Sequence, residues 1–222
     1  MRLVIEGNIS SGKSTLIRYF QKKIKDDEIC INDSGRIYFN TDPRFNILQL
    51  ASNDPKRWTF LLQLTFLSFL KEREKEDAKR FTITARSTLS VINVFSKSYL
   101  GQGFISNEEY NYLEDFDNLH KSEPCDVLIF ISSTQHLNRC SNSLMKEKSI
   151  LYSQFYERKH FLDTVISKRF AKKIIILNGD LPLEELERET DVALEIPGTD
   201  NNGIMVYEAN TYQEVLKLIN TV

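Results

Sequence analysis

Met1-Arg-Leu-Val-Ile-Glu-Gly-Asn-Ile-Ser-Ser-Gly-Lys-Ser-Thr15 opens this chain of 222 residues and decides its fold. Residues 3–5 form an apolar run that suits a buried strand, and apolar residues recur at helical spacing from Leu16 onward. Between the two, residues 7–14 fit the pattern G-x-x-x-x-G-K-[ST]. A strand, a glycine-rich loop and a helix, in that order, are the surroundings that a phosphate-binding loop requires. The opening stretch therefore predicts a phosphate site.

The residue types of this loop match the chemistry of phosphate binding. Gly7 and Gly12 let the backbone curl so that successive N–H groups face phosphate oxygens, and the helix N-terminus adds partial positive charge. Lys13 is expected to reach the β- and γ-phosphates, and the Ser14 hydroxyl to ligate Mg²⁺. The alternative is an ordinary glycine turn, but chance places the whole pattern in a chain of this length only about once in a hundred sequences. The predicted nucleotide-binding residues are Gly7, Asn8, Ile9, Ser10, Ser11, Gly12, Lys13, Ser14 and Thr15.

Composition limits the classes of protein to consider. With 41% hydrophobic residues, 29 basic and 31 acidic side chains, one α/β domain with a full core is expected, without bulk attraction to nucleic acid or membrane. The three cysteines show no C-x-x-C spacing, which argues against a zinc site or a disulfide framework and for a reducing compartment. The longest apolar stretch, residues 60–70, is interrupted by polar residues and too short to span a bilayer. We expect a cytoplasmic protein with small-molecule partners.

Strand and helix signals alternate along the chain. Apolar strand candidates lie at residues 3–6, 28–31, 81–84, 127–132 and 173–177, and helical patterns at 13–25, 55–77, 88–99, 107–121 and 149–170. Such alternation predicts βαβ units and a mostly parallel sheet with helices on both faces. Residues 192–196 and 204–207 flank a turn at 197–203, and a helix over 212–219 follows. We therefore expect a single domain over 1–222, with residues 191–222 as a C-terminal extension made of a short hairpin and a helix.

Other proteins with phosphate-binding loops fit the chain less well. A GTPase needs an Asn-Lys-x-Asp motif, which the sequence lacks. An ATPase motor needs an acidic Mg²⁺ partner at the end of an apolar strand, whereas the strand at 127–131 is followed by Ser132-Ser-Thr134. Asp180 follows the last predicted strand, but the intervening Gly179 favours a turn. A kinase acting on a small molecule remains.

Several blocks of the sequence resemble the deoxynucleoside kinase family. Residues 5–16 (IEGNISSGKSTL) are similar to the family's E-G-N-I-x-x-G-K-S-T opening, and residues 54–63 (DPKRWTFLLQ) to its P-x-x-W-x-F-x-x-Q helix. Residues 84–87 (TARS) stand where the family has E-R-S, and looser likenesses extend to about residue 189. The resemblance implies a P-loop three-layer sandwich, with a five-stranded parallel sheet flanked by helices and a nucleoside pocket beside the phosphates.

The same resemblance implies roles for individual residues. ATP and Mg²⁺ would be the cofactors, with Lys13 and Arg86 acting on the phosphoryl group. Glu6, Trp58, Gln63 and Arg86 would contact the nucleoside, while Arg139 and Asp180 would lie on the ATP side and Ser14 at the metal. For Arg86 the alternative is a structural ion pair with a carboxylate. The oligomeric state, including a homodimer, is left open.

The interpretation of Gln63 as a residue that binds the base also follows from the sequence itself, independently of the family resemblance. Its helix is apolar on most faces, so part of it must be buried, and a buried amide without partners costs about 1–3 kcal/mol. The edge of a nucleic-acid base offers the matching donor and acceptor, and Trp58 and Phe60 could supply apolar walls. The alternative is a glutamine that bonds backbone groups in the core or lies at the helix surface.

The departures from the family pattern concern catalysis. Ala85 replaces the E-R-S glutamate that helps hold Mg²⁺, and Ser34 falls closest to the glutamate that takes the proton from the sugar 5′-hydroxyl. Asp33, one residue away, could act as the base, although an Asx turn is the alternative. Val91 and Ile92 replace an acidic–basic pair, and Arg139 is the one arginine between residues 135 and 157.

Three functions therefore compete. The first is an ATP-dependent (deoxy)nucleoside kinase with Asp33, Arg86 and Lys13 as catalytic residues. The second is a catalytically impaired member of the family that binds nucleotides or serves as a scaffold. A nucleoside-monophosphate kinase is a weaker third.

Overall fold

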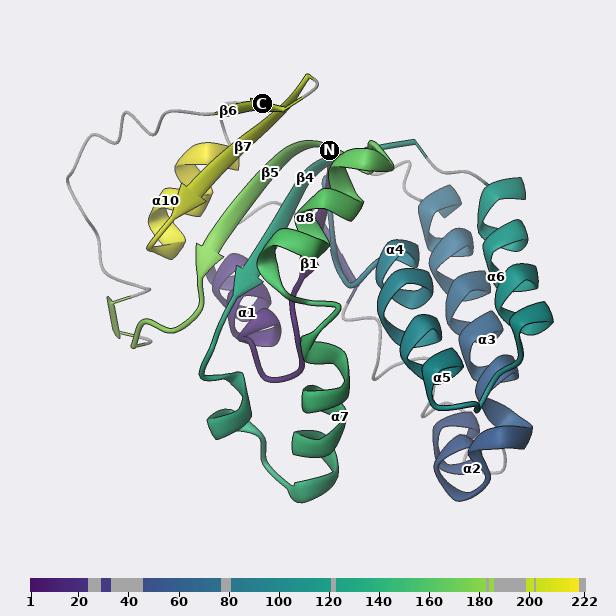
Figure 1. The fold of residues 1–222 in the computed structure, drawn as a ribbon. Coiled ribbons are helices and arrows are strands. Elements are labelled where there is room, and N and C mark those ends of the chain that lie inside the picture. Colours follow the sequence, from purple (N-terminus) through teal and green to yellow (C-terminus); the bar gives the residue numbers. More distant parts are fainter. Residues whose placement is uncertain are drawn as a thin grey trace.

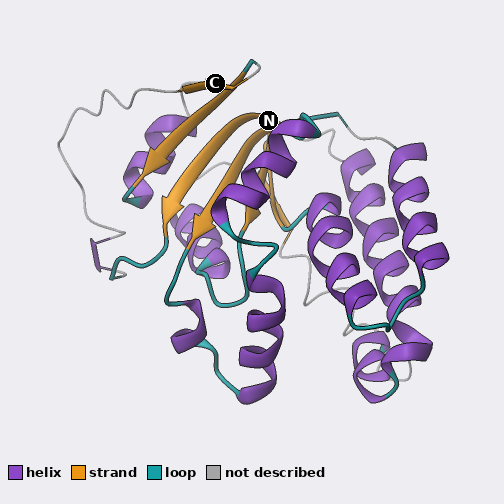
Figure 2. Ribbon diagram, in the orientation of Figure 1, coloured by secondary structure: helices purple, strands orange, loops and turns teal. Residues whose placement is uncertain are grey.

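A single seven-stranded sheet forms the centre of the molecule (Figures 1 and 2). The computed structural model describes residues 1–23, 29–32, 46–76, 81–120, 123–182, 184–185, 199–201 and 203–219. The strand order is β2-β3-β1-β4-β5-β7-β6. The strands are β1 (Arg2–Glu6), β2 (Ile29–Asn32), β3 (Phe81–Ala85), β4 (Cys125–Ser132), β5 (Ala171–Asn178), β6 (Thr199–Asn201) and β7 (Ile204–Ala209).

The five predicted strands, β1 to β5, pair in parallel with one another, so the predicted fold class is confirmed. Leu3 is aligned with Val127 across β1 and β4, and Ile5 with Ala85 across β1 and β3. The central strands are buried on both faces, which explains why they are continuous apolar runs rather than alternating ones.

Helices cover both faces of this sheet. On one face, α1 (Lys13–Lys23) and α10 (Tyr212–Ile219) pack in one apolar cluster with β1, β4 and β5. On the other face, α7 (Ser143–Ser153) and α8 (Arg158–Ser167) pack against β4 and β5 through Tyr152, Phe161 and Val165. A third apolar cluster joins further helices beside the sheet: α3 (Pro55–Glu76), the segment made of α4 (Thr88–Ser90), η1 (Val91–Ser96) and α5 (Lys97–Gly101), and α6 (Asn107–Leu119).

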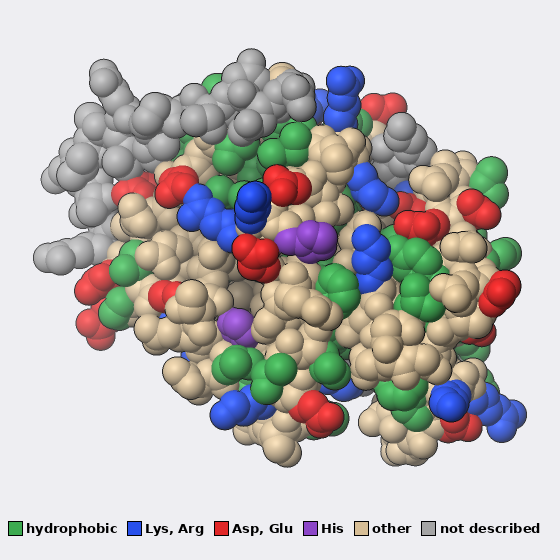
Figure 3. Space-filling view, in the orientation of Figure 1, with side chains coloured by type: hydrophobic (Ala, Val, Ile, Leu, Met, Phe, Trp, Pro, Cys, Tyr) green, Lys and Arg blue, Asp and Glu red, His purple; other side chains and the backbone are tan. Residues whose placement is uncertain are grey.

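The surface bears out the balanced composition. Basic and acidic side chains are interspersed over the face in Figure 3 rather than gathered by sign. Among the described residues, no helix combines the length and the apolar character that crossing a membrane requires.

Two predicted helices differ from the observed ones. The pattern over residues 149–170 belongs to two helices, α7 and α8, with a break at 154–157 where Glu157 is non-helical (φ −58°, ψ 129°). Both helices cover the same face, so the apolar spacing continues across the break with a slip of one residue, from Tyr156 to Phe161. The pattern over 88–99 is helical throughout, but Val91–Ser96 is a π-helix. Helix α2 (Ile47–Asn53) and the 3₁₀ turn η2 (His136–Arg139) are not predicted by the sequence.

The C-terminal part of the chain extends the sheet by two strands. Strand β7 lies parallel to β5, with Lys173 aligned to Met205 and Leu177 to Ala209, and β6 pairs with β7 in the antiparallel sense. The predicted turn over 197–203 is too long, because Thr199–Asn201 pair with β7. The strand predicted at 192–196 lies outside the described residues, and the helix predicted at 212–219 is confirmed.

Helix α10 shares the apolar core of the parallel sheet, which can be tested by one substitution. Val215 is fully buried in that cluster, so Val215→Ala removes two carbons from a packed site and should lower the free energy of unfolding by about 2 kcal/mol. Lys217→Ala, at an exposed position of the same helix, should change it by less than about 0.5 kcal/mol. Urea denaturation measures both, and an unchanged midpoint for Val215→Ala would show that α10 adds nothing to the common core.

Candidate functional site

The loop between β1 and α1 is held tightly against β4. Gly7 has φ +143°, and a Cβ atom there would lie 2.7 Å from the carbonyl oxygen of Ile131. Gly12 (φ 110°) and Ser10 (φ 61°) also adopt left-handed backbone conformations. Residues other than glycine rarely adopt a φ of +143°, and β4 leaves no space for a Cβ atom here. Glycine is therefore required at position 7.

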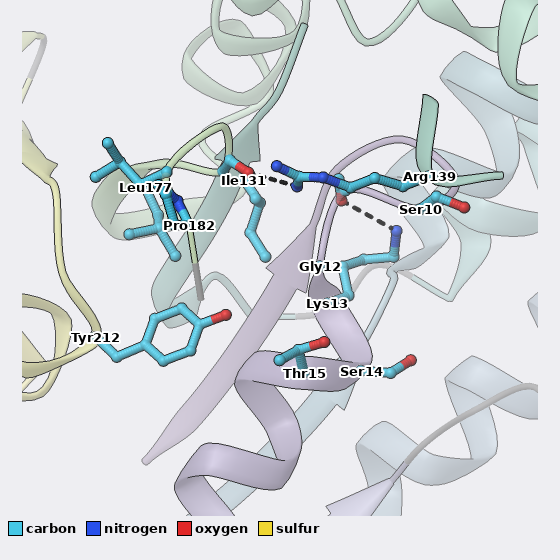
Figure 4. A pocket seen from close by; sticks show the side chains of 13 residues that line it. Ser10, Gly12, Lys13, Ser14, Thr15, Ile131, Arg139, Leu177, Pro182 and Tyr212 are labelled. Atoms are coloured by element: carbon cyan, nitrogen blue, oxygen red, sulfur yellow. Dashed lines mark hydrogen bonds between the residues drawn. The ribbon is translucent and has the colours of Figure 1, made fainter. Parts of the chain in front are cut away.

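A cavity of about 510 Å³ opens over this loop (Figure 4). Its polar side is formed by the loop itself, residues 10–15, together with Arg139. Its other side is mostly apolar. The lining residues are Ser10, Ser11, Gly12, Lys13, Ser14, Thr15, Ile131, Arg139, Leu177, Gly179, Leu181, Pro182 and Tyr212. Such a cavity fits a small molecule with an anionic end and an apolar end.

Cationic side chains face the loop from two directions. The ammonium of Lys13 donates to the carbonyl oxygens of Gly7 (2.8 Å) and Asn8 (2.5 Å). Arg139, from η2, donates from Nη1 to the carbonyl oxygen of Gly179 at 2.5 Å. Both cations therefore lie at the cavity, and both bond to backbone carbonyl oxygens; their binding to phosphate stays a prediction.

The Asn8 side chain turns away from the cavity and connects the loop to the helices beside it. The side chain is buried, and its Nδ2 lies within hydrogen-bonding distance of the carbonyl oxygen of Ser149 (3.0 Å), Ser153 Oγ (3.2 Å) and Nε2 of His136 (3.1 Å). Because His136 Nδ1 lies 2.7 Å from the carbonyl oxygen of Ser133, Nδ1 carries the proton and Nε2 accepts. Gly7, Asn8 and Ile9 are not among the residues that line the cavity. Asn8 instead joins the phosphate-binding loop to α7 and η2.

Glu6, predicted to contact substrate, is fully buried behind the loop. Ser87 Oγ donates to its Oε1 at 2.6 Å, and the Tyr156 hydroxyl donates to its Oε2 at 3.1 Å. Each carboxylate oxygen therefore has a protein partner, which is what a buried carboxylate requires. In this structure Glu6 thus connects the end of β1 to Ser87, after β3, and to Tyr156; its contact with a substrate stays a prediction.

Arg86 is held in a strained conformation at the end of β3. Its φ of 73° is left-handed, which for a residue other than glycine costs of the order of 1–3 kcal/mol. Its Nη1 donates to the Tyr156 hydroxyl at 2.7 Å, and its guanidinium lies 4.8 Å from the ring centroid of Phe95. Burial raises the pKa of Tyr156 although the Arg86 charge acts to lower it, so the hydroxyl keeps its proton for Glu6. These contacts hold Arg86 through a neutral hydroxyl and an aromatic ring rather than through the carboxylate of the alternative interpretation.

Asp180, which is predicted to lie on the ATP side, forms hydrogen bonds with the turn that follows β4. Its carboxylate accepts from Ser133 Oγ (2.6 Å), from N and Oγ1 of Thr134 (2.8 and 2.7 Å) and from the backbone N–H of Gln135 (3.1 Å). Desolvation acts to raise the pKa of Asp180, but these hydrogen bonds outweigh it and lower the pKa to about 2. The carboxylate fixes the turn after β4 that leads to Arg139, and Asp180 itself does not line the cavity.

The residues predicted to contact the base, Trp58 and Gln63, lie on helix α3. Gln63 is 2% exposed, and its Oε1 has no hydrogen-bond partner in the part of the chain that the structure describes. Trp58 packs against Ile47 and Ala51 of α2, with the Arg57 guanidinium 5.0 Å from its ring centroid. Gln63 thus keeps the polar atom that a base could satisfy, whereas Trp58 has a packing role.

The positions that depart from the family pattern are accounted for in part. Ala85, Val91 and Ile92 are buried, the last two in the cluster between α3 and α6. Asp33 and Ser34 lie outside the described residues. Among the residues that are described, no group of three or more His, Cys, Asp or Glu side chains could hold a metal. Ser14 is exposed at the cavity, where its hydroxyl could ligate Mg²⁺ together with water and phosphate oxygens.

Three residues that join these parts are not identified by sequence analysis. Tyr156 bonds both Glu6 and Arg86, His136 bonds Asn8, and Tyr212 forms part of the cavity wall. The one-residue slip in apolar spacing at Tyr156 is a signal that could have marked it. Nothing in the local sequence marks the other two.

The hydrogen bonds of Asp180 should make the free energy of unfolding depend on pH. A depressed pKa contributes stability above the ordinary carboxyl pKa of about 4, and this contribution is lost as pH falls toward 2. Asp180→Asn should lower the unfolding free energy at pH 7 by about 1 kcal/mol, a value discounted because water screens a partly exposed group. Urea denaturation should show the gap to wild type closing between pH 4 and pH 2. Asp163→Asn, at an exposed site on α8, is the matched control, and a gap independent of pH would contradict the assignment.

Comparison with known proteins agrees with this geometry. The sequence model of the family described as deoxynucleoside kinase matches residues 3–177. Mitochondrial deoxyguanosine kinase of Xenopus laevis is 25% identical over 186 residues (72% of this chain, 70% of that protein), and the putative kinase protein 029R of Invertebrate iridescent virus 3 is 23% identical over 184 (81% and 89%).

Solved structures show the same fold. Deoxyadenosine kinase from M. mycoides with bound dCTP superposes with a TM-score of 0.69 at 16% identity, over 100% of both chains. The same enzyme with bound dATP gives 0.64 at 21% identity, over 82% of this chain and 93% of that one. Because the family's sequence pattern extends over most of the sheet and its helices, this chain belongs to the deoxynucleoside kinase family.

Proposed function

We propose that this protein transfers the γ-phosphoryl group of ATP to the 5′-hydroxyl of a (deoxy)nucleoside. The observation that carries the proposal is the cavity over residues 10–15, where a phosphate-binding loop, two cations and an apolar wall meet. Membership of the deoxynucleoside kinase family supports the choice of acceptor.

The donor half of the site rests on electrostatics. The loop N–H groups and the N-terminus of α1 attract the phosphates, and Lys13 and Arg139 would exchange their carbonyl partners for phosphate oxygens. Ser14 would hold Mg²⁺, which when bound neutralises charge on the phosphate oxygens. Phosphoryl transfer needs little more from a protein than such positioning and charge.

The acceptor half rests on Arg86 and Gln63. Arg86 lies at the carboxyl end of β3, next to the phosphate-binding loop, where it would meet the 5′-oxygen or the transferred group. A base edge would give the buried carbonyl of Gln63 the donor that the described residues do not supply. Asp33 is proposed as the base that takes the 5′-hydroxyl proton.

The competing proposal is a nucleotide-binding or scaffold protein without turnover. Buried Ala85 favours it, because a methyl group cannot hold the metal, and so does the single arginine of residues 135–157. Turnover measurements separate the two.

The deciding experiment mixes the protein with Mg-ATP and each of the four deoxynucleosides and follows ADP and monophosphate. Kinases work at about 1–100 turnovers per second, and loss of an efficient general base costs about 10²–10⁴-fold. We expect slow turnover that Asp33→Asn abolishes while ATP binding persists, and that Ala85→Glu raises. Lys13→Ala should weaken ATP binding and is the control for the phosphate site. If both wild type and Ala85→Glu bind nucleotide tightly without turnover, the kinase proposal is wrong and the nucleotide-binding protein is the better explanation.

The role of Gln63 is tested separately from turnover. If its amide pairs with the base, Gln63→Ala should weaken nucleoside binding by about 1–3 kcal/mol with little change in stability. Titration calorimetry and urea denaturation measure the two quantities. Thr59→Ala, at a buried polar position one turn earlier on α3, is the matched control. Equal losses of affinity and stability for Gln63→Ala would make the amide structural.

A further inference from the structure

The segment that carries Arg139 is a single 3₁₀ turn, η2, which begins at His136. A 3₁₀-helix has three residues per turn, so side chains at positions i and i+3 lie on the same side. His136 and Arg139 are spaced in this way. His136 contacts Asn8 of the phosphate-binding loop, and Arg139 lines the cavity over that loop and extends to Gly179 (Figure 4). His136 is buried and is not among the residues that line the cavity.

The hydrogen-bond roles around His136 follow by elimination. Its Nδ1 lies 2.7 Å from the carbonyl oxygen of Ser133, which can only accept, so Nδ1 carries a proton. Ser153 Oγ lies 3.2 Å from Nε2, but its single proton goes to the carbonyl oxygen of Ser149 at 2.7 Å. In the neutral ring, Nε2 therefore accepts its hydrogen bond from Asn8 Nδ2 at 3.1 Å. The ring thus joins η2 to the phosphate-binding loop by a directed hydrogen bond.

Asn8 receives this bond in a fixed orientation. Its Oδ1 accepts from the backbone N–H of Ile9 at 2.7 Å, so its NH₂ group is the part that faces His136. The backbone oxygen of Asn8 accepts from Lys13 Nζ at 2.5 Å. One residue is therefore bonded to the first cation, Lys13, through its backbone and to the turn of the second cation, Arg139, through its side chain.

The start of η2 is fixed by a second anchor. Asp180 accepts from Ser133 Oγ and from the backbone N–H groups of Thr134 and Gln135, directly before the turn. The bond of His136 adds a contact from the turn itself to the loop. A long side chain such as arginine holds a ligand in one geometry only where its own backbone is held to within about 0.5 Å. The two anchors together meet this condition.

We propose that His136 is a positioning residue of the donor site: through Asn8 it holds η2 against the phosphate-binding loop, so that Arg139 and Lys13 reach the same triphosphate. The inference rests on the proposed function in that ATP is the ligand of the cavity. The contribution of Arg139 to ATP binding then depends on His136. The contribution of Lys13 does not, because Lys13 lies on the loop side of the hydrogen bond.

Two replacements of His136 separate its hydrogen bonds. In His136→Asn the amide nitrogen takes the place of Nδ1 and can donate to Ser133, but nothing accepts from Asn8. In His136→Gln the amide oxygen reaches as far as Nε2 and can accept from Asn8. Titration calorimetry with Mg-ATP should give a Kd about 3- to 10-fold above wild type for His136→Asn, and within about 2-fold of wild type for His136→Gln. His160→Asn, the same change at an exposed site on α8, should leave the Kd unchanged.

Double substitutions test the positioning itself. Arg139→Ala should raise the Kd of ATP about 10-fold in wild type, as the loss of a charged hydrogen bond predicts, but less than about 3-fold in His136→Asn. Lys13→Ala should raise the Kd by the same factor in both backgrounds. A merely structural role of His136 would weaken both contributions alike. Should His136→Asn be unfolded by urea denaturation, His136→Leu, which fills the space without an acceptor, takes its place.

The other outcomes overturn the inference. If the effects of His136→Asn and Arg139→Ala multiply, the two residues act independently and His136 does not position Arg139. Unchanged affinity in His136→Asn, or equal losses of affinity and stability in His136→Asn and His136→Gln, would also overturn it. Wild type that binds no ATP would remove the donor site and this inference together. Coupling between His136 and Arg139 in a protein without turnover would keep the inference while the kinase reaction fails.

Discussion

The cavity over the phosphate-binding loop depends on the parallel alignment of the central strands. Parallel pairing brings the carboxyl ends of β1, β3, β4, β5 and β7 to one edge, where the phosphate-binding loop, Arg86, the turn leading to Arg139, the loop at Leu181 and Tyr212 all emerge. Segments more than 200 residues apart in the chain thereby face one cavity. The close fit of Gly7 against Ile131 fixes the loop to this edge. Loss of that register would scatter the site.

Two buried polar networks connect the edge to the helices above it. In one, Tyr156 links Arg86 to Glu6, so that the strained backbone of Arg86 is stabilised by a neutral hydroxyl and a carboxylate behind it. In the other, Asn8 binds His136 and α7. Buried polar groups are costly unless each has a partner, so these networks set the position of the loop relative to α7 and α8. Through His136, the second network also reaches η2, the turn that carries Arg139.

The two halves of the proposed site differ in the kind of groups that they present. In the proposed kinase, the donor half is the loop with Lys13 and Arg139, whose bonds to backbone carbonyls a phosphate would displace. On the acceptor side, apolar side chains at 85, 91 and 92 are packed in the core, and Gln63 keeps an unsatisfied carbonyl in the part that the structure describes. Binding and catalysis are therefore separable questions for this chain, because a loop can bind phosphate where a metal ligand is absent.

The sequence by itself determined the parallel sheet, the phosphate-binding loop and the family, because these follow from local patterns: apolar runs, glycine spacing and helical periodicity. It also singled out Lys13, Arg139 and Gln63, and the structure has the first two at the cavity and the third in the interior. It predicted ligand contacts for Glu6, Asn8 and Asp180, whose side chains bond to other parts of the chain in the structure, since residue type and position indicate that a polar group lies near a site but not which way it points. The contacts of Tyr156, His136 and Tyr212 were decided by the tertiary structure alone. Tyr156 meets Glu6, His136 meets Asn8 and Tyr212 meets Tyr19 across more than a hundred residues of chain, and only the packing of helices on the sheet brings such contacts together.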